Sequence, residues 1–386
     1  MNRSTVMGFV KKYTMVLALI VLVIFFTVRT DGSMLLPQNI NNLIAQNAYV
    51  YILATGMLLC ILTGGNIDLS VGSLVCLVGS IGGTMMVTKH MGAAAAIPVM
   101  LLAGILVGVW QGFWIAYRRI PPFIVTLAGM LAFRGISNVV LDGLTLAPMP
   151  DNYLNLFNGY IVDFMKGDKI NMSCMVIGVV AVVAMFLVSL NSRRSKAKKG
   201  YSTGSLAGQL VKLIVIGAAI IFFAWKLANY KGIPYILVWL AVIIAVYAYI
   251  TSRTTVGRHF YAIGGNEKAA KLSGINTNRV YFLAYANMGF LAAVAAMVTI
   301  ARLNSANPTA GTNYEMDAIG SCFVGGASAY GGSGTVPGVV IGATLMGVIN
   351  LGMSIMGVDA NWQKVVKGLV LLAAVIFDVE SKKLAK

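Results

Sequence analysis

Charged residues are scarce in this chain. Asp, Glu, Lys and Arg together make 11% of its 386 residues, whereas they make about 25% of a typical soluble domain. Hydrophobic residues make 58%, and the mean hydropathy is +0.82. Apolar runs of about 17–25 residues recur along the sequence, which is the length needed to cross the ~30 Å hydrocarbon layer of a bilayer. The composition excludes a soluble domain and predicts an all-α polytopic membrane protein.

Sequence patterns for metal, nucleotide or catalytic chemistry are missing too. The chain has only two histidines, His90 and His259, and no CxxC pair. It has no G-x-x-x-x-G-K-[ST] phosphate loop, no H-E-x-x-H motif and no Ser/His/Asp cluster. We therefore expect no metal site, no cofactor and no catalytic residue in this chain. We expect its cysteines to be small buried hydrophobic residues: Cys60, Cys76, Cys174 and Cys322.

The basic residues are distributed unevenly. The formal net charge is +17, with 29 Lys and Arg against 12 Asp and Glu. Basic residues gather at both ends of the chain and around residues 118–119, 193–199 and 253–279. If the spans alternate, all these places fall on one side of the membrane, as the positive-inside rule expects of the cytoplasmic side. The pattern argues against a nucleic-acid surface and predicts that both termini are cytoplasmic.

The hydrophobic pattern predicts a single transmembrane domain over residues 1–386, with about 12 spans and at least 10. No small-x-small cleavage site follows the first span, so we expect that span to be retained. The predicted spans are 13–28, 43–63, 68–87, 93–117, 122–141, 171–190, 209–228, 233–251, 280–301, 314–330, 336–355 and 361–378.

Two polar loops, 191–208 and 252–279, are predicted in the cytoplasm. Glycine and polar residues interrupt the spans 43–63, 68–87 and 314–330. Each of these three is therefore a candidate for a broken or re-entrant segment.

Glycine recurs at every fourth position in several spans, most clearly at Gly104, Gly108 and Gly112. Small residues on one stripe allow helix backbones to approach closely, and packing inside one subunit is favoured over a subunit interface. In addition, Gly64-Gly65 and Gly325-Gly326 each separate an apolar stretch from a glycine-patterned span. This weak internal repeat is typical of transporters with broken helices.

The loop at residues 253–279 is the longest polar interruption in the second half, and it carries five basic residues and one acid. Within it, residues 266–274 predict a short capped helix. Asn266 suits the N-cap, Glu267 suits the positive end of the helix dipole, and Gly274 suits the stop. A helix of two turns is marginal alone in water, so we expect this helix to dock onto another protein.

Polar residues inside or beside apolar stretches are our candidates for a translocation pathway. Asp68 has two interpretations, because an intramembrane acid usually lines a cavity or meets a partner, but Asp68 also suits the N-cap of the span 68–87. The cap is favoured. Asn287 and Asn350 either face a channel or hydrogen-bond across helices, and the latter is favoured. The candidates are Asn66, Asp68, Ser70, Phe123, Thr126 and Asn287.

Other charged residues are expected to have structural or peripheral roles. Arg134 lies well inside the span 122–141, and structural pairing is favoured over contact with a solute. On the outer side, Asp151, Glu315 and Asp359 are candidates to meet basic residues of an external partner, or simply to be solvated.

Five stretches, in order along residues 40–380, resemble the permease subunits of bacterial monosaccharide ABC importers of the ribose/galactose/xylose group. The resemblance is closest to xylose-type permeases, because residues 155–232 are expected to add two spans joined by the basic loop 193–199. The stretches are TGGNIDLSVG (63–72), PFIVTL (122–127), YAIGGNE (261–267), LSGIN (272–276) and PTAG (308–311).

This resemblance implies a homodimeric pore of the type II importer kind in a bacterial inner membrane. Two copies of an ATPase subunit, which carry the ATP and Mg, are expected to dock on the cytoplasmic side. A periplasmic or lipid-anchored sugar-binding protein is expected outside. The short helix matches the family's coupling segment, with Ala269, Leu272 and Ile275 as an apolar face. The ATPase-coupling candidates are Asn266, Glu267, Lys268, Ala269, Ala270, Lys271, Leu272 and Gly274.

Three alternatives remain open at this point. A proton-coupled secondary sugar transporter would use Asp68 or Arg134 as its switch. An ABC permease of the same fold would carry another small solute, such as a nucleoside. A passive channel would need no docking helix.

Overall fold

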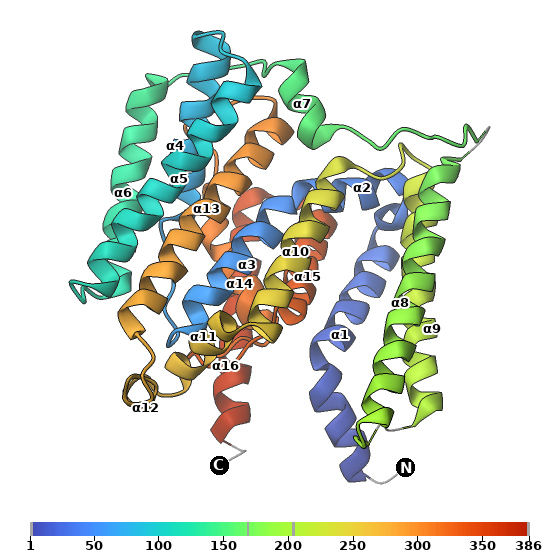
Figure 1. Ribbon diagram of the computed structural model, residues 1–386. Helices are drawn as coiled ribbons and strands as arrows, with labels where there is room; N and C mark the ends of the chain where they lie inside the picture. Colours follow the sequence, from blue (N-terminus) through green and yellow to red (C-terminus); the bar gives the residue numbers. More distant parts are fainter. Residues whose placement is uncertain (1–2, 168–169, 203–204, 384–386) are drawn as a thin grey trace.

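The computed structural model describes residues 3–167, 170–202 and 205–383, and these residues are overwhelmingly helical (Figure 1), so the all-α prediction is confirmed. The helices are α1 (Arg3–Arg29), η1 (Ser33–Leu35), α2 (Pro37–Gln46), α3 (Ala48–Leu62), α4 (Val71–Gly83), η2 (Thr84–Thr88), α5 (Ala93–Ala116), α6 (Pro122–Leu141), α7 (Asp151–Asn158), α8 (Met172–Lys198), α9 (Leu206–Ala228), α10 (Tyr235–Arg253), α11 (Thr255–Gly265), α12 (Glu267–Leu272), α13 (Thr277–Leu303), α14 (Tyr314–Val324), α15 (Val336–Ile355) and α16 (Ala360–Lys383).

Within the described residues, nine helical segments are long and apolar enough to cross a membrane. They correspond to nine of the twelve predicted spans. The other three predictions, 13–28, 314–330 and 361–378, fall in α1, α14 and α16. The first of these three corresponds to the apolar helical stretch Met15–Arg29.

The first interruption lies between α3 and α4. Residues 63–70 are not helical, and the N–H of Asp68 lies 3.4 Å from Sδ of Met57 in the middle of α3. The chain therefore turns back along α3 before α4 begins at Val71. This break lies between the predicted spans 43–63 and 68–87, and the helical part of the second span starts three residues late, at Val71.

The second interruption follows α14. The predicted span 314–330, a candidate for a broken or re-entrant segment, is not a continuous helix, because α14 ends at Val324 and residues 325–335 are a loop. The cause is local, since Gly326 has φ +86°, a conformation that favours glycine and ends helices. At eleven residues, α14 is about 16 Å long, so it crosses only part of a ~30 Å hydrocarbon layer.

The two interruptions lie against each other. The N–H of Gly332 donates to the carbonyl of Leu62 at 3.1 Å. A Cβ on Gly331 would lie 2.5 Å from the Cα of Gly64, and a Cβ on Gly65 would overlap the carbonyl oxygen of Ala329. Glycine is therefore required at these positions, and the weak internal repeat marks two segments in direct contact.

The helices form an inner layer and an outer layer. Inside the bundle, 72% of the most apolar 18-residue stretch is buried for α2–α3, for α4–η2 and for α13, and 67% is buried for α15. In contrast, α8 and α9 form a hairpin at one edge (Figure 1), with only 17% and 11% buried. This hairpin corresponds to the two spans predicted within residues 155–232. The cysteines lie inside, buried and with free thiols, as expected.

The predicted polar loops are more helical than expected. The loop 191–208 begins late, because α8 continues to Lys198 and its basic residues extend the helix. Lysine in a last helical turn is favourable beside the negative end of the dipole. Residues 252–279 contain α11 as well as α12, so this segment is a pair of helices.

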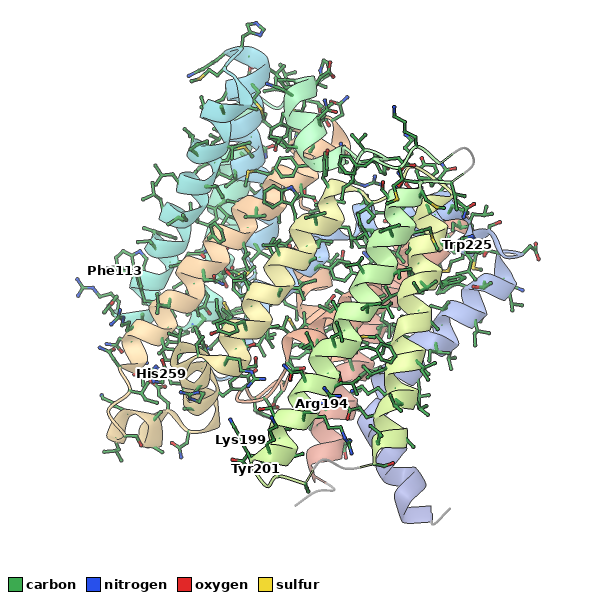
Figure 2. The ribbon with its side chains drawn as sticks, turned by 45° about the vertical axis from the view of Figure 1, so that its right-hand side comes forward. Phe113, Arg194, Lys199, Tyr201, Trp225 and His259 are labelled. Carbon is green, nitrogen blue, oxygen red and sulfur yellow. The ribbon has the colours of Figure 1, made fainter. Side chains whose placement is uncertain are left out.

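The ends of the chain indicate the orientation. α1 begins and α16 ends at the same end of the molecule as α12 (Figure 1). Arg194, Lys199 and Tyr201 also lie at that end, whereas Trp225 lies at the opposite end (Figure 2). The arrangement agrees with the positive-inside pattern, and the cytoplasmic location of the termini stays a prediction.

The close packing of α5 against α13 depends on glycine. A Cβ on Gly108 would lie 2.6 Å from the carbonyl oxygen of Tyr285, and a Cβ on Gly104 would lie 2.6 Å from the carbonyl oxygen of Gly289. The stripe that begins at Gly104 is thus used for packing inside this chain, as the sequence favoured.

We predict that Gly108→Ala destabilises the chain by about 1–3 kcal/mol, because the added methyl group forces two backbones apart. Gly135→Ala is the matched control, since nothing lies within 4 Å of a Cβ there. Thermal unfolding of the detergent-solubilised proteins measures the difference. Equal melting temperatures for the two variants would contradict this account of the packing.

Candidate functional site

Residues 254–274 fold into two short helices at one end of the bundle. Asn266 caps α12 as predicted, accepting a hydrogen bond from the N–H of Ala269 at 3.0 Å. Gly274, with φ +85°, ends it, also as predicted. α11 was not predicted from the sequence, although Thr254 gave a signal: its hydroxyl accepts from the N–H of Gly257 at 3.1 Å, the pattern of an N-cap.

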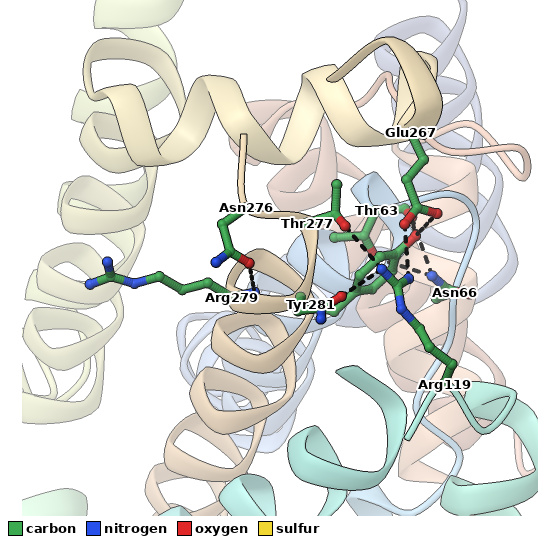
Figure 3. Close-up of polar contacts among 9 residues, drawn as sticks. Thr63, Asn66, Arg119, Glu267, Asn276, Thr277, Arg279 and Tyr281 are labelled. Atoms are coloured by element: carbon green, nitrogen blue, oxygen red, sulfur yellow. Dashed lines mark hydrogen bonds and ion pairs between the residues drawn. The ribbon is translucent and has the colours of Figure 1, made fainter. Parts of the chain in front are cut away.

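An ion pair fixes α12 to the body of the protein (Figure 3). Glu267 contacts Arg119, which follows α5, at 2.8 Å, and Tyr281 of α13 donates to the same carboxylate at 3.1 Å. Arg119 also donates to the side chains of Thr277 and Asn278 at 2.9 and 2.6 Å. We call this cluster of Arg119, Glu267, Thr277, Asn278 and Tyr281 the α12 anchor.

The α12 anchor affects the acidity of Glu267. Partial burial by itself raises the pKa of the carboxyl group, but hydrogen bonds from Arg119 and Tyr281 outweigh it, and the pKa lies below its ordinary value. The anchor therefore contributes its stability above the ordinary carboxyl pKa and loses it as the pH falls through the lowered value. The contacts that Glu267 makes here, with Arg119 and Tyr281, lie within this chain.

The outer face of α12 is open. Leu272 is 90% exposed, and Lys268, Ala269 and Lys271 are exposed as well. Ala270 is buried beneath them. Of the predicted apolar face, Ala269 and Leu272 are therefore available to a partner, whereas Ile275 packs partly against the core.

α11 connects this end to the two interruptions. The hydroxyl of Tyr261 donates to the carbonyl of Gly334 at 2.8 Å. A Cβ on Gly264 would overlap the carbonyl oxygen of Leu62 and the backbone of Gly332. Any displacement of α11 therefore acts directly on the loops 63–70 and 325–335.

Three pathway candidates lie in the first of these loops. Asp68 is 1% exposed, and its Oδ1 accepts from the N–H and the hydroxyl of Ser70 at 2.8 and 2.7 Å. The side chain of Gln111 donates to the same hydroxyl at 2.6 Å. Asn66 donates to Thr63 within its own turn at 3.2 Å. Asp68 thus caps the turn before α4, close to its favoured role, while its Oδ2 is buried without a partner among the described residues.

The other candidates do not join this group. Thr126 is buried, and its hydroxyl donates to the carbonyl of Pro122 one turn earlier in α6. Phe123 is 55% exposed at the start of the same helix. Asn287 accepts a short hydrogen bond from the hydroxyl of Tyr247, which links α13 to α10 as a contact between helices.

Arg134 makes its contacts within the chain, and Glu315 is buried. Arg134 donates to the carbonyls of Pro308 and Ala310 at 3.0 and 2.6 Å, which is a structural role, as favoured. Glu315 is only 8% exposed, so its expected contact with an external partner was wrong. It faces inward because α14 starts inside the bundle, where Asp317 pairs with Lys367 at 2.9 Å.

The other two outer acids, Asp151 and Asp359, are exposed. Among the described residues, no group of three or more His, Cys, Asp or Glu side chains is placed to hold a metal ion.

Known transport permeases resemble this chain over most of its length. The sequence matches a family model described as "Branched-chain amino acid transport system / permease component" over residues 39–197 and 153–375. It is 38% identical over 371 residues to the xylose transport system permease protein XylH of Haemophilus influenzae, covering 96% of each chain. It is 37% identical to XylH of Escherichia coli over 96% of this chain and 92% of that one. It is 32% identical to the ribose import permease protein RbsC of Escherichia coli over 98% and 99%. No solved structure matches it significantly.

We predict that Glu267→Lys releases α12, because the new ammonium group would lie beside Arg119. An exposed ion pair contributes up to about 1 kcal/mol, so hydrogen exchange of the α12 amides should accelerate about fivefold. Lys268→Glu on the exposed face is the control and should leave exchange unchanged. Unaltered exchange in Glu267→Lys would show that the α12 anchor does not hold the helix.

Proposed function

This chain belongs to the family of branched-chain amino acid transport system permease components, and on that basis we propose that it is the membrane-spanning subunit of an ATP-binding-cassette importer for a monosaccharide. The resemblance noted in the sequence is confirmed by relatives whose names specify xylose or ribose. A pentose such as xylose is the first candidate cargo, and a hexose is the second. The chain moves the solute and catalyses no reaction.

The observation that carries the proposal is the exposed apolar residue on an anchored helix. Leu272, at 90% exposed, stands on α12 at the end where the chain begins and ends. A two-turn helix is marginal by itself, and here the α12 anchor holds it in place, so that its exposed face is preformed for a partner. We infer that this partner is the ATPase subunit, which supplies ATP and Mg.

The remaining partners follow from the same assignment. Two ATPase copies would dock below a homodimer of this chain in the bacterial inner membrane, and a sugar-binding protein, periplasmic or lipid-anchored, would dock at the opposite end. Closure of the ATPase pair would push α12 and α11. Because Tyr261 and Gly264 contact the second loop and Leu62, this push would shift both helix interruptions together.

A second candidate function rests on Asp68. Its Oδ2 is buried without a partner among the described residues, which would suit a proton-coupled sugar transporter in which this oxygen takes up a proton. Arg134 supports that alternative less, because backbone carbonyls already occupy its guanidinium group. A nucleoside permease of the same family differs only in its cargo.

The energy source separates the two candidates. Uptake of radiolabelled xylose and ribose is measured in cells that express this chain with its ATPase and binding protein. We expect uptake to be lost when the catalytic glutamate of the ATPase is replaced and to persist in the presence of a protonophore while ATP is maintained. The reverse result would identify a secondary transporter.

The docking surface is tested separately with Leu272→Asp. We expect at least a tenfold loss of uptake and of ATPase co-purification, because a carboxylate replaces the exposed apolar contact. Folding should be unaffected, since Leu272 packs against almost nothing within this chain. Leu272→Met keeps the apolar surface and should behave as wild type. Normal uptake by the aspartate variant would rule out Leu272 as a docking residue.

A further inference from the structure

A cavity of about 350 Å³ lies between α2, α3, α13, α14 and α15, away from the end that carries α12. The junction of α2 and α3, the last turns of α13, the first residue of α14 and Asn350 of α15 form its wall. Its volume lies within the range of ~300–1,000 Å³ that is common for small-molecule sites. Asn350, which the sequence allowed either to face a channel or to hydrogen-bond across helices, lines this cavity, whereas Asn66, Asp68, Ser70, Phe123, Thr126 and Asn287 are not part of its lining.

Two amide side chains in this wall are buried and incompletely hydrogen-bonded. Asn47 is 1% exposed and Asn350 is 6% exposed. Asn47 donates to the carbonyl of Leu43 at 2.8 Å, but its Oδ1 has no partner among the described residues, and the Oδ1 of Asn350 has none either. Buried acceptors are nearly always paired in folded proteins. A donor that this chain does not supply is therefore expected in the cavity.

The rest of the wall indicates which kind of ligand supplies it. The rings of Tyr49 and Tyr314 stack with their centroids 3.5 Å apart, and the hydroxyl of Tyr49 donates to Asp317 at 2.6 Å, which fixes the ring. Arg302 adds hydrogen-bond donors to the lining. The lining thus combines amide acceptors, guanidinium donors and aromatic rings.

This combination fits a neutral polyol better than other solutes. An anion accepts hydrogen bonds only and would leave the amide oxygens unpaired, whereas an apolar solute would leave every polar group unpaired. Each sugar hydroxyl both donates and accepts, and the C–H groups of a sugar ring suit an aromatic wall. The same groups around one cavity therefore match a monosaccharide.

We propose that this cavity is a subsite for the transported monosaccharide, in which the Oδ1 atoms of Asn47 and Asn350 accept hydrogen bonds from two sugar hydroxyls. This inference rests on the proposed function and deepens it, because it gives the permease its own contacts with the cargo. The subsite lies in the half of the molecule that faces the binding protein, so sugar released by that protein reaches it before the helix interruptions.

The test uses the complete transporter, with its ATPase and binding protein, reconstituted in liposomes. Asn350→Leu and Asn47→Leu keep the branched shape and the number of side-chain heavy atoms and remove the acceptors. We expect each to lower uptake of radiolabelled xylose or ribose at least tenfold, while ATP hydrolysis stimulated by the binding protein stays within twofold of wild type. Asn41→Leu is the matched control, because Asn41 is also buried with an unpartnered Oδ1 but lies outside the cavity lining.

The outcomes separate this inference from the proposed function. If wild type takes up neither sugar, the proposed function fails. If wild type takes them up and both variants transport normally, the cavity holds only water and the subsite is overturned. Loss of stimulated ATP hydrolysis together with uptake would indicate a structural role for the asparagines and would also overturn it.

A gentler variant covers the case in which the leucine variants fail to fold. Thr299→Val removes one hydroxyl from the lining at nearly constant volume. We expect it to raise the KM for uptake at least threefold or to change the preference between xylose and ribose, with the melting temperature of the permease unchanged. An unchanged KM and unchanged preference would contradict the subsite.

Discussion

Two non-helical segments inside a helical bundle constrain most of this structure. Buried peptide groups that leave a helix lose their hydrogen bonds and must find others, and in a membrane protein this is possible only where protein surrounds them. The loops 63–70 and 325–335 meet this requirement by lying against each other, as the bond from Gly332 to Leu62 shows. Glycine at 65 and 331 allows the two backbones to approach, and the neighbouring helices are arranged around this contact.

The same contact between the two loops also connects elements that are distant in the sequence. α11 packs directly on the two interruptions, and the α12 anchor holds the neighbouring α12 against Arg119 and α13. On the other side, α14 is a short helix whose first residue lines the outer cavity and whose last turn runs into the second interruption. A movement imposed at α12 therefore has a short route of packed backbone to the cavity, which is the connection that an ATP-driven importer needs.

Local signals in the sequence predicted local structure well. Asn266 and Gly274 marked the ends of α12 because capping depends only on neighbouring residues. Gly64-Gly65 and Gly325-Gly326 marked the interruptions for the same reason. α14 ends at Val324, however, which is earlier than the end at residue 330 that the hydrophobic pattern predicted. The positions of the basic residues predicted which loops lie at the same end of the molecule. The basic segment after residue 191 is nevertheless helical to Lys198, because lysine and arginine are compatible with a helix. Glu315 was placed outside, since nothing in its sequence neighbours shows that α14 starts within the bundle.

The sequence by itself determined the class of the protein, the approximate spans and the positions at which helices begin and break, because hydrophobic length and capping act within a few residues. Only the tertiary structure decided where the side chains of those segments point. Arg119 and Glu267 meet across 148 positions of sequence, and Asn47 and Asn350 line one cavity from opposite ends of the chain. Such pairs have no common signal in a single sequence, because their proximity is set by how glycine-lined helices pack, and packing depends on the whole bundle at once.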